Sequence, residues 1–319
     1  MHWTYQKGLH DLGNGSFAWL APDGSWGWSN AGLITDGEES LLVDTLFDLD
    51  LTREMLAAMR DAAPQASDRI DTLVNTHANG DHCHGNELVS GAEIIASAAS
   101  AEEMAELPPD ALAAFVDMAR DMGPTGEYFL HCFGKFSFAG IQFTPPTRTF
   151  QGRLDLQVGD KAIELIEVGP AHTRGDVLVH CPTDKTVFTG DILFIEGTPI
   201  MWQGPVANWI AACQRIEAMD VETIVPGHGP ITDKAGVRRV REYLEYVRDQ
   251  ARERFDAGMG AQEAARDIDL GTYAKWLDSE RIAVNVDTLY REFSNESQTT
   301  DIIELFSNMA ELAGFGDSL

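Results

Sequence analysis

The sequence predicts an α/β fold in which two β-sheets pack face to face with helices outside, followed by a helical C-terminal extension. Two strand-rich stretches, residues 15–50 and 153–230, predict the sheets. A helical pattern over residues 50–62 joins two strands and completes a β-α-β unit. A chain of 319 residues with 44% hydrophobic residues can bury the large core that such a fold needs.

The opening stretch alternates predicted strands with turns. Residues 31–35 and 40–45 flank Asp36-Gly37, which predicts a hairpin. Over residues 50–62, apolar side chains recur at helical spacing, and Asp50 is the expected N-cap of that helix. An apolar run over residues 71–74 then predicts a buried strand.

An insertion of about residues 98–132 follows. Residues 98–122 are rich in alanine and methionine and are broken by Pro108-Pro109, which predicts two helices. This segment could cover a site as a lid. It could equally be extra packing at the edge of the domain.

The second half repeats the strand signals. Strands are predicted at residues 154–158, 162–168, 177–181 and 186–188, and a helix at residues 208–218. Helices are predicted in the tail at residues 237–255, 283–293 and 302–312. The tail could close a pocket or form a homodimer contact.

Side chains that bind metals follow the predicted strands. Three histidines and Asp81 lie within residues 77–84, directly after the strand over residues 71–74. Further along the chain, each in a tight loop at a strand end, are His172, Asp191 and His228. Imidazole nitrogen and carboxylate oxygen are ligands that zinc prefers. The pattern therefore predicts a metal centre where these loops converge.

Together these segments resemble the metallo-β-lactamase superfamily, whose signature is H-x-H-x-D-H followed by distant His, Asp and His. The resemblance runs from about Gly15 to Pro230, in the family's order. It implies an αββα sandwich of two mixed sheets as a catalytic domain over residues 1–230. The remaining residues, 231–319, would form the helical extension.

The resemblance also implies two metal sites of unequal strength. The second site is matched completely by Asp81, His82, Asp191 and His228, with Asp191 bridging the metals. The first site retains His77 and His172, but Asn79, a poor and neutral donor, stands where the family has its second histidine. We therefore expect a tighter second site, and a single metal is an alternative.

His84 is not expected to replace the lost ligand. If a helix starts near Asp81, His84 lies about 200° around it from His82 and points away from the metal. Asp44 ends a strand near the metal loop, where it could orient a ligand histidine or form a structural turn.

The family's chemistry implies hydrolysis. Zinc, as one or two ions, would supply a bound hydroxide that attacks an ester, lactone, thioester or amide bond of a small molecule. Asp81 would be the catalytic ligand that orients the hydroxide. Iron or manganese could replace zinc. Two other functions stay open: an iron-dependent redox enzyme of the dioxygenase type, and a non-catalytic binding protein with a degenerate site.

Three side chains near the ligands are candidates for substrate binding. Trp26 and Trp202 could line an apolar pocket, although core packing is an alternative for both. Arg174 could bind a substrate carboxylate with two hydrogen bonds. Its alternatives are solvent exposure and a salt bridge with Asp176.

Composition limits the partners. The chain has 51 acidic and 23 basic residues and a net charge of −28, which repels polyanions and counts against a nucleic-acid substrate. Four widely spaced cysteines without a C-x-x-C motif do not predict a disulfide framework. No signal region and no run long enough for a bilayer are evident, so we expect a cytoplasmic protein without a membrane partner.

Overall fold

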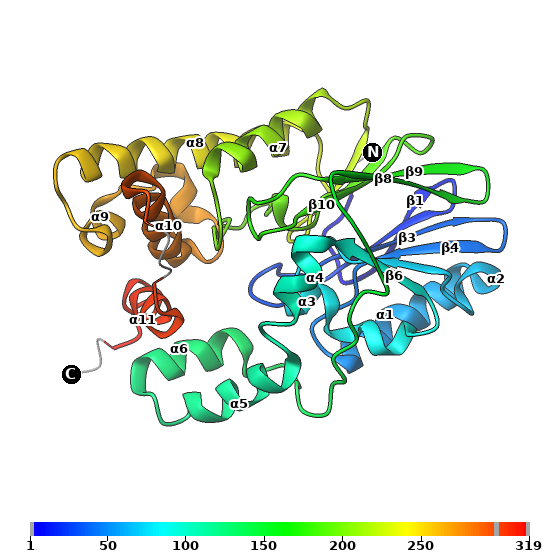
Figure 1. The fold of residues 1–319 in the computed structure, drawn as a ribbon, viewed down its shortest axis with the longest axis horizontal. Helices are drawn as coiled ribbons and strands as arrows, with labels where there is room; N and C mark the ends of the chain where they lie inside the picture. Colours follow the sequence, from blue (N-terminus) through cyan, green and yellow to red (C-terminus); the bar gives the residue numbers. More distant parts are fainter. Residues whose placement is uncertain (1–2, 297–299, 317–319) are drawn as a thin grey trace.

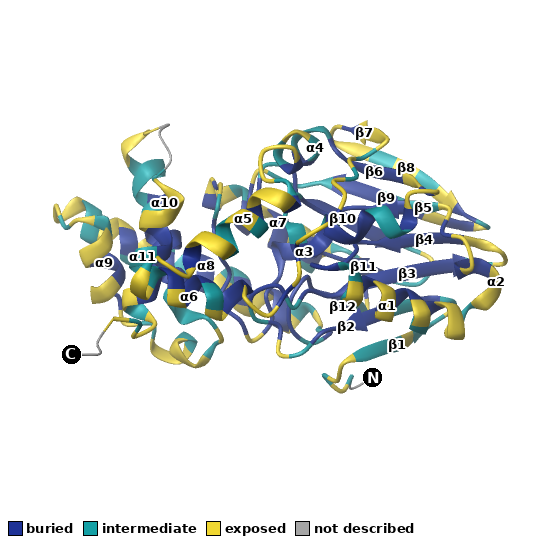
Figure 2. Ribbon diagram, turned by 90° about the horizontal axis from the view of Figure 1, so that it is seen from below, coloured by how far each residue is buried: buried dark blue, intermediate teal, exposed yellow. Residues whose placement is uncertain are grey.

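The computed structural model describes residues 3–296 and 300–316. Two mixed β-sheets pack face to face, helices cover their outer faces, and further helices form the C-terminal part of the chain (Figure 1). The predicted αββα arrangement with a helical C-terminal extension is confirmed. The central strands of both sheets are buried, whereas the strands at the sheet edges and the outer turns of the helices are more exposed (Figure 2).

The first sheet has seven strands in sequence order. Its first four strands are antiparallel and the remaining three run parallel to the fourth. The predicted hairpin is present, with Thr35 paired to Ser40. The strands are β1 (Gly8–Gly13), β2 (Ser16–Leu20), β3 (Ala31–Asp36), β4 (Glu39–Val43), β5 (Thr72–Val74), β6 (Glu93–Ser97) and β7 (Arg148–Phe150).

The second sheet has five strands, ordered β12-β11-β10-β9-β8. Only the β11–β12 pair is parallel, because α7 (Val206–Ala218) returns the chain to the sheet between them. The strands are β8 (Arg153–Val158), β9 (Lys161–Glu167), β10 (Val177–Cys181), β11 (Thr186–Phe188) and β12 (Thr223–Val225).

Apolar side chains fill the space between the sheets. Ile34 and Val74 from the first sheet meet Leu165 and Phe188 from the second. Gly32 permits this close approach, because a Cβ atom there would lie 2.1 Å from the Phe188 ring. The inner faces thus hold the two sheets at a fixed distance, which positions the loops at their common edge.

Helix α1 (Leu49–Ala62), followed by the short α2 (Pro64–Ser67), covers the outer face of the first sheet through Met55 and Met59. Its N-cap is Asp48, whose side chain accepts a hydrogen bond of 2.9 Å from the Leu51 amide. The prediction that Asp50 caps this helix is wrong. The helix begins one residue earlier than its apolar pattern, so Asp50 lies in the first turn.

The insertion contains one helix more than predicted. The proline pair separates α4 (Ala98–Met104) from α5 (Pro109–Ala119), as expected, and α6 (Gly123–Phe133) follows. Helix α6 packs on α5 and on α11 (Ile302–Leu312) of the C-terminal extension. The insertion and the end of the described chain therefore lie side by side (Figure 1).

The C-terminal extension shares its hydrophobic core with the sandwich. Trp209 of α7, Leu244 of α8 (Lys234–Asp256) and Leu289 of α10 (Ile282–Ser294) belong to one buried cluster that also reaches the outer face of the second sheet. None of the helices described over residues 3–296 and 300–316 is long and apolar enough to span a bilayer. Shorter elements complete this part: α9 (Ala261–Asp267), η3 (Gly271–Lys275) and η4 (Ser279–Arg281).

Replacing Asp48 with alanine tests the cap assignment. The Leu51 amide and the Ser137 amide, at 3.2 Å, would both lose their acceptor. We expect the free energy of unfolding to fall by about 1–2 kcal/mol in urea titrations. Asp50→Ala is the matched control and should change stability little, because its salt bridge with Arg53 is exposed. An equal loss from both variants would contradict the assignment.

Candidate metal centre

The six predicted ligands come together at one edge of the sandwich. His77 follows β5, and Asp81 and His82 lie on the short helix α3 (Gly80–Cys83). The other three come from loops of the second half: His172 lies between β9 and β10, Asp191 in η2 (Gly190–Ile192) after β11, and His228 after β12. All six side chains are buried.

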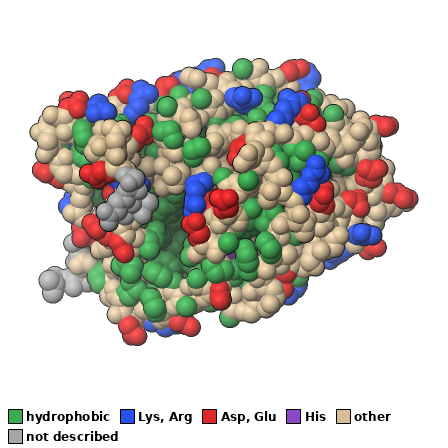
Figure 3. Space-filling model, in the orientation of Figure 1, with side chains coloured by type: hydrophobic (Ala, Val, Ile, Leu, Met, Phe, Trp, Pro, Cys, Tyr) green, Lys and Arg blue, Asp and Glu red, His purple; other side chains and the backbone are tan. Residues whose placement is uncertain are grey.

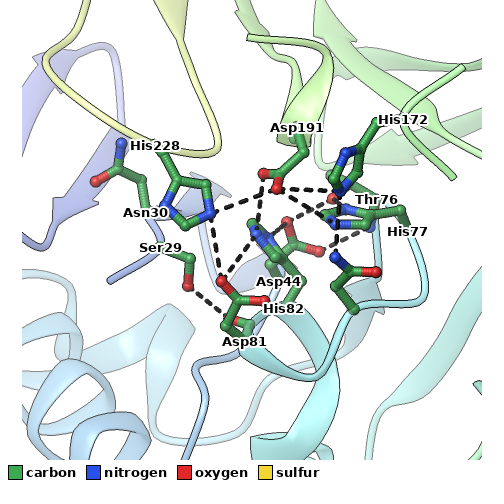
Figure 4. Close-up of polar contacts among 12 residues, drawn as sticks. Ser29, Asn30, Asp44, Thr76, His77, Asp81, His82, His172, Asp191 and His228 are labelled. Atoms are coloured by element: carbon green, nitrogen blue, oxygen red, sulfur yellow. Dashed lines mark hydrogen bonds and ion pairs between the residues drawn. The ribbon is translucent and has the colours of Figure 1, made fainter. Parts of the chain in front are cut away.

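The four residues predicted for the second site lie in contact with one another (Figure 4). Asp191 Oδ1 lies 3.1 Å from His82 Nε2, and Asp191 Oδ2 lies 3.4 Å from His228 Nε2. Asp81 Oδ2 lies 3.3 Å from His228 Nε2 and 3.8 Å from His82 Nε2. Ligand atoms around a tetrahedral zinc ion are about 3.3 Å apart, given bonds of about 2.0–2.1 Å. Asp81, His82 and His228 offer ligand atoms that all lie within 4.8 Å of one another, and so, as a separate group, do His77, His82 and Asp191. Asp191 contacts His82 and His228 through different oxygens, so each group could hold a cation and Asp191 lies beside both.

The other half of the centre is less complete. His172 Nε2 and His77 Nε2 lie 3.4 and 3.7 Å from Asp191 Oδ2, which is thus shared between both halves. Asn79 Nδ2 lies 3.2 Å from His172 Nε2. The Asn79 amide can donate to this nitrogen and so occupy the lone pair that a metal would need. The weakness expected of the first site stays a prediction.

Each of the four histidines uses its Nδ1 atom for a hydrogen bond outside the centre. His172 Nδ1 donates to the Ile200 carbonyl at 2.7 Å and His228 Nδ1 to the Gly24 carbonyl at 3.0 Å. A protonated Nδ1 leaves the Nε2 lone pair free to bind a metal. Nε2 of His77, Nε2 of His82 and Asp191 Oδ1 are buried without a hydrogen-bond partner. Buried polar atoms of this kind require a ligand, and these donors fit a divalent cation.

Asp44 orients the two remaining histidines. Its Oδ2 atom accepts hydrogen bonds from His82 Nδ1 at 2.9 Å and from the Thr76 hydroxyl at 2.7 Å. The Thr76 oxygen in turn lies 3.0 Å from His77 Nδ1. One buried carboxylate thus fixes His82 directly and His77 through Thr76, so the orienting role considered for Asp44 agrees with the geometry.

The loop that carries His228 is fixed by the opening strands. The Asn30 side chain donates to the carbonyl groups of Pro226 and Gly229 at 3.0 and 2.8 Å. Gly227 must lack a side chain, because a Cβ atom there would lie 1.9 Å from Asp191 Oδ1. The residues Asn30 and Gly227 therefore hold His228 and Asp191 at contact distance.

Burial and the mutual contacts of these groups determine their charges. Burial, assisted by repulsion from His82, lowers the pKa of His77 well below its usual value. Burial also lowers the pKa of His228, but its contacts with the carboxylates of Asp191 and Asp81 have the larger combined effect. The pKa of His228 therefore rises to about 9. Asp81 is likewise buried, yet its contacts with His82 and His228 lower its pKa to about 2. Positive charge beside Asp81 thus favours its ionised form, whether imidazolium groups or a bound cation supply that charge.

A cavity of about 420 Å³ opens onto the centre. Asp81, Asp191 and His228 line one end, and Trp26 and Trp202 line its wall, as was predicted for a substrate pocket. A hollow lined by hydrophobic side chains is visible between α4 and α11 in Figure 3. The role of the two tryptophans in substrate binding stays a prediction.

Arg174 lies on the rim of this cavity, where acidic side chains engage it. Its guanidinium pairs with both carboxylate oxygens of Glu106, and its amide donates to Glu103 at 3.0 Å. Asp176, considered as its partner, instead accepts hydrogen bonds from Thr173. A substrate carboxylate would have to displace Glu106 before it could bind Arg174.

His84 is packed and does not join the donor group. Its ring is buried and stacks on Phe47, with ring centroids 5.6 Å apart. Ser29 and Thr76 support the site but were not identified from the sequence: Ser29 donates to the Asp81 carbonyl, and Thr76 bridges His77 to Asp44. Single hydroxyl residues in a loop carry no spacing signal that could have revealed them.

Comparisons with known proteins agree with this geometry. The family model described as "Metallo-beta-lactamase superfamily" matches residues 24–228. The beta-lactamase-like protein 2 homolog of Caenorhabditis elegans is 25% identical over 225 residues, or 70% of this chain, which spans only 63% of that protein's length. The human acyl-coenzyme A thioesterase MBLAC2 is 26% identical over 212 residues, covering 63% of this chain and 72% of that protein.

More distant relatives and solved structures extend this picture. A hydroxyacylglutathione hydrolase of Brucella abortus is 25% identical over 197 residues, covering 61% of this chain and 59% of that protein. A metallo-beta-lactamase from Pontibacter korlensis has a TM-score of 0.57 at 20% identity, over 75% of this chain and 99% of that one. The sec-alkylsulfatase Pisa1 from Pseudomonas sp. has a TM-score of 0.68 at 15% identity, over 90% of this chain and 50% of that one. At these identities the two structures show the fold alone.

Asn79→His should complete the first half of the centre. A histidine there would add an imidazole beside His77 and His172, so we expect the zinc content to rise from about one to about two ions per chain. Asn79→Ala is the control, because it removes the amide without adding a donor. Metal analysis after dialysis against low zinc measures both. An unchanged content in Asn79→His would place this position outside the coordination sphere.

Asp44→Asn should weaken metal binding without removing a ligand. The new amide nitrogen would face His82 Nδ1 and disturb the hydrogen bond that sets its tautomer. We expect zinc affinity, measured by competition with a chelator, to fall about 10- to 100-fold. Asp50→Asn, at an exposed helix position, should leave affinity at the wild-type value. If both variants bind zinc equally well, Asp44 does not orient the ligand histidines.

Proposed function

The chain belongs to the metallo-β-lactamase superfamily, and from this premise we propose that it is a metal-dependent hydrolase of a small acyl compound, an ester or a thioester. Asp81, His82, Asp191 and His228 would hold the principal ion, which we propose to be zinc. His77 and His172, with Asn79, would form the weaker site, which is the first site of the family's pattern.

The observation that carries this proposal is the meeting of two features at one place. Buried Nε2 atoms of His77 and His82 lack hydrogen-bond partners, and the same centre forms the inner end of an open cavity. A purely structural metal site is closed by its ligands, whereas a catalytic site leaves room for a substrate beside the metal. The cavity thus favours catalysis over a structural role.

A bound zinc ion would supply Lewis acidity and make a water nucleophile available at neutral pH. The residues of this chain would position that reaction. Asp81 lines the cavity, where its side chain could accept a hydrogen bond from a water and so orient that water toward the substrate. Asp44 holds His82, and through Thr76 also His77, so that neither ring turns during turnover.

The kind of bond follows from the named activities of two relatives. One is an acyl-coenzyme A thioesterase and the other a hydroxyacylglutathione hydrolase, and both names describe the hydrolysis of acyl compounds. An acyl carbonyl is also a group that a Lewis acid can polarise and that a neighbouring, oriented water can attack. We therefore place esters and thioesters ahead of lactones and amides.

Turnover of a panel of neutral acyl esters and thioesters by the purified protein tests the proposal. We expect hydrolysis that a chelator abolishes and zinc restores. Asp81→Asn should lower kcat by about 100-fold, because a neutral amide replaces the carboxylate that would both bind the ion and orient the water. Asp11→Asn, on the exposed strand β1, is the matched control and should leave kcat unchanged.

Three results would contradict the proposal in different ways. Turnover that survives both the chelator and Asp81→Asn would place the reaction elsewhere. A protein that purifies with stoichiometric iron and consumes oxygen would be the redox enzyme that the sequence leaves open. Absence of bound metal, even after incubation with zinc, would favour the non-catalytic binding protein.

A further inference from the structure

The cavity continues from the metal centre into an apolar arm between α5, α6 and α11. We propose that this arm holds the unbranched aliphatic chain of the acyl substrate, so that the protein acts on medium- or long-chain acyl compounds. The inference rests on the proposed hydrolase function and specifies its substrate class. It comes from the walls of the cavity, their charges and their connection to the centre.

The walls of the arm are aromatic and continuous. Phe115 of α5 contacts Phe129 of α6 at 4.5 Å between ring centroids, and Phe129 contacts Phe306 of α11 at 5.2 Å. Phe133 completes the wall, 5.8 Å from Phe47. All five side chains line the cavity. A surface of this kind binds methylene groups through the hydrophobic effect and offers no hydrogen-bond partner.

The arm begins directly at the metal centre. Phe194, which also lines the cavity, stacks on the His228 ring with centroids 5.0 Å apart and planes 4° apart. Trp26 lies 5.5 Å from Phe133 and so connects this inner end with the walls of the arm. A chain attached to a carbonyl beside Asp81 would therefore pass from the centre onto aromatic surface without crossing solvent.

The arginine side chains of the cavity already have acidic partners and are poorly placed to bind a polar substrate tail. Of the described residues that line it, the arginines are Arg174 and Arg281. Arg174 is paired with Glu106 at the rim. Arg281 is buried, pairs with Asp278 at 2.9 Å, donates to the Thr198 carbonyl and lies 4.2 Å above the Trp26 ring. Nε of Arg281 has no hydrogen-bond partner, but Asp278 balances the charge of this guanidinium and Glu106 that of Arg174. An apolar chain therefore suits the arm better than a carboxylate tail.

The mouth of the cavity carries apolar side chains that face solvent. Leu107, after α4, is 63% exposed, and Ile302, at the start of α11, is 46% exposed, and both belong to the cavity lining. In Figure 3 the hydrophobic surface accordingly extends from the hollow to its edge. A chain that passes between them would remove this surface from water, which favours long chains over short ones.

Binding of straight-chain carboxylates, from butanoate to tetradecanoate, tests the inference without requiring turnover. Calorimetric titration of the purified protein gives the dissociation constant for each chain. We expect affinity to rise about fourfold per added methylene, equivalent to about 0.8 kcal/mol, until the arm is filled. For the corresponding esters the gain should appear in KM and not in kcat, because the chain makes the same contacts in the ground and transition states.

A pair of alanine positions on α5 locates the binding site. Both alanines are exposed on the same helix, but Ala111 lines the cavity and Ala114 does not. Ala111→Phe should narrow the arm, so that affinity stops rising at a shorter chain than in the wild type. Ala114→Phe adds the same surface outside the cavity and should give the wild-type series.

Equal affinity for all chain lengths would overturn the inference, as would identical series for Ala111→Phe and Ala114→Phe. These outcomes are separable from a failure of the proposed function. Carboxylates that bind with the expected length dependence, together with esters that are not hydrolysed, would retain the apolar arm and reject the hydrolase. Hydrolysis of short esters, together with carboxylate binding that does not depend on chain length, would retain the hydrolase and reject the apolar arm.

Discussion

Three carboxylates, Asp44, Asp81 and Asp191, are buried together where loops from the two sheets meet, and the imidazole rings of four histidines surround them. Burying ionised groups is costly unless opposite charge compensates them. The loops at this edge offset that cost, because they supply imidazole groups and hydrogen bonds to the buried carboxylates. A divalent cation would satisfy the unpartnered nitrogens and balance the charge of the carboxylates.

The two halves of the centre differ in how firmly they are built. In one half, Asp81, His82 and His228 offer ligand atoms within 4.8 Å of one another, and Asp191 contacts both imidazoles. In the other half, Asn79 supplies an amide that hydrogen-bonds to His172. Neutral amides bind zinc less well than imidazole or carboxylate groups do. This asymmetry in the chain favours one principal ion and leaves the face beside Asn79 open to the cavity.

The helical parts around the sandwich give the cavity its character. The insertion contributes Phe129 and Phe133, and the C-terminal extension contributes Phe306 and Arg281. These segments pack on one another through aromatic contacts, so the arm exists only when both are in place. The sandwich thus carries the reactive centre, while the added helices shape the space in which a substrate would lie.

The sequence by itself determined the fold class and most of the strands, because strand periodicity is a local signal. It also singled out six histidine and aspartate side chains that the structure brings together, although their role as metal ligands stays a prediction. It did not locate β1 or α6, and it placed the cap of α1 at Asp50 when the structure uses Asp48. Tertiary structure alone decided that Thr76 links His77 to Asp44, that Glu106 occupies Arg174, and that Phe306 faces Phe133. Each of these contacts depends on loop conformation or on packing between distant segments, which no local pattern of residues encodes.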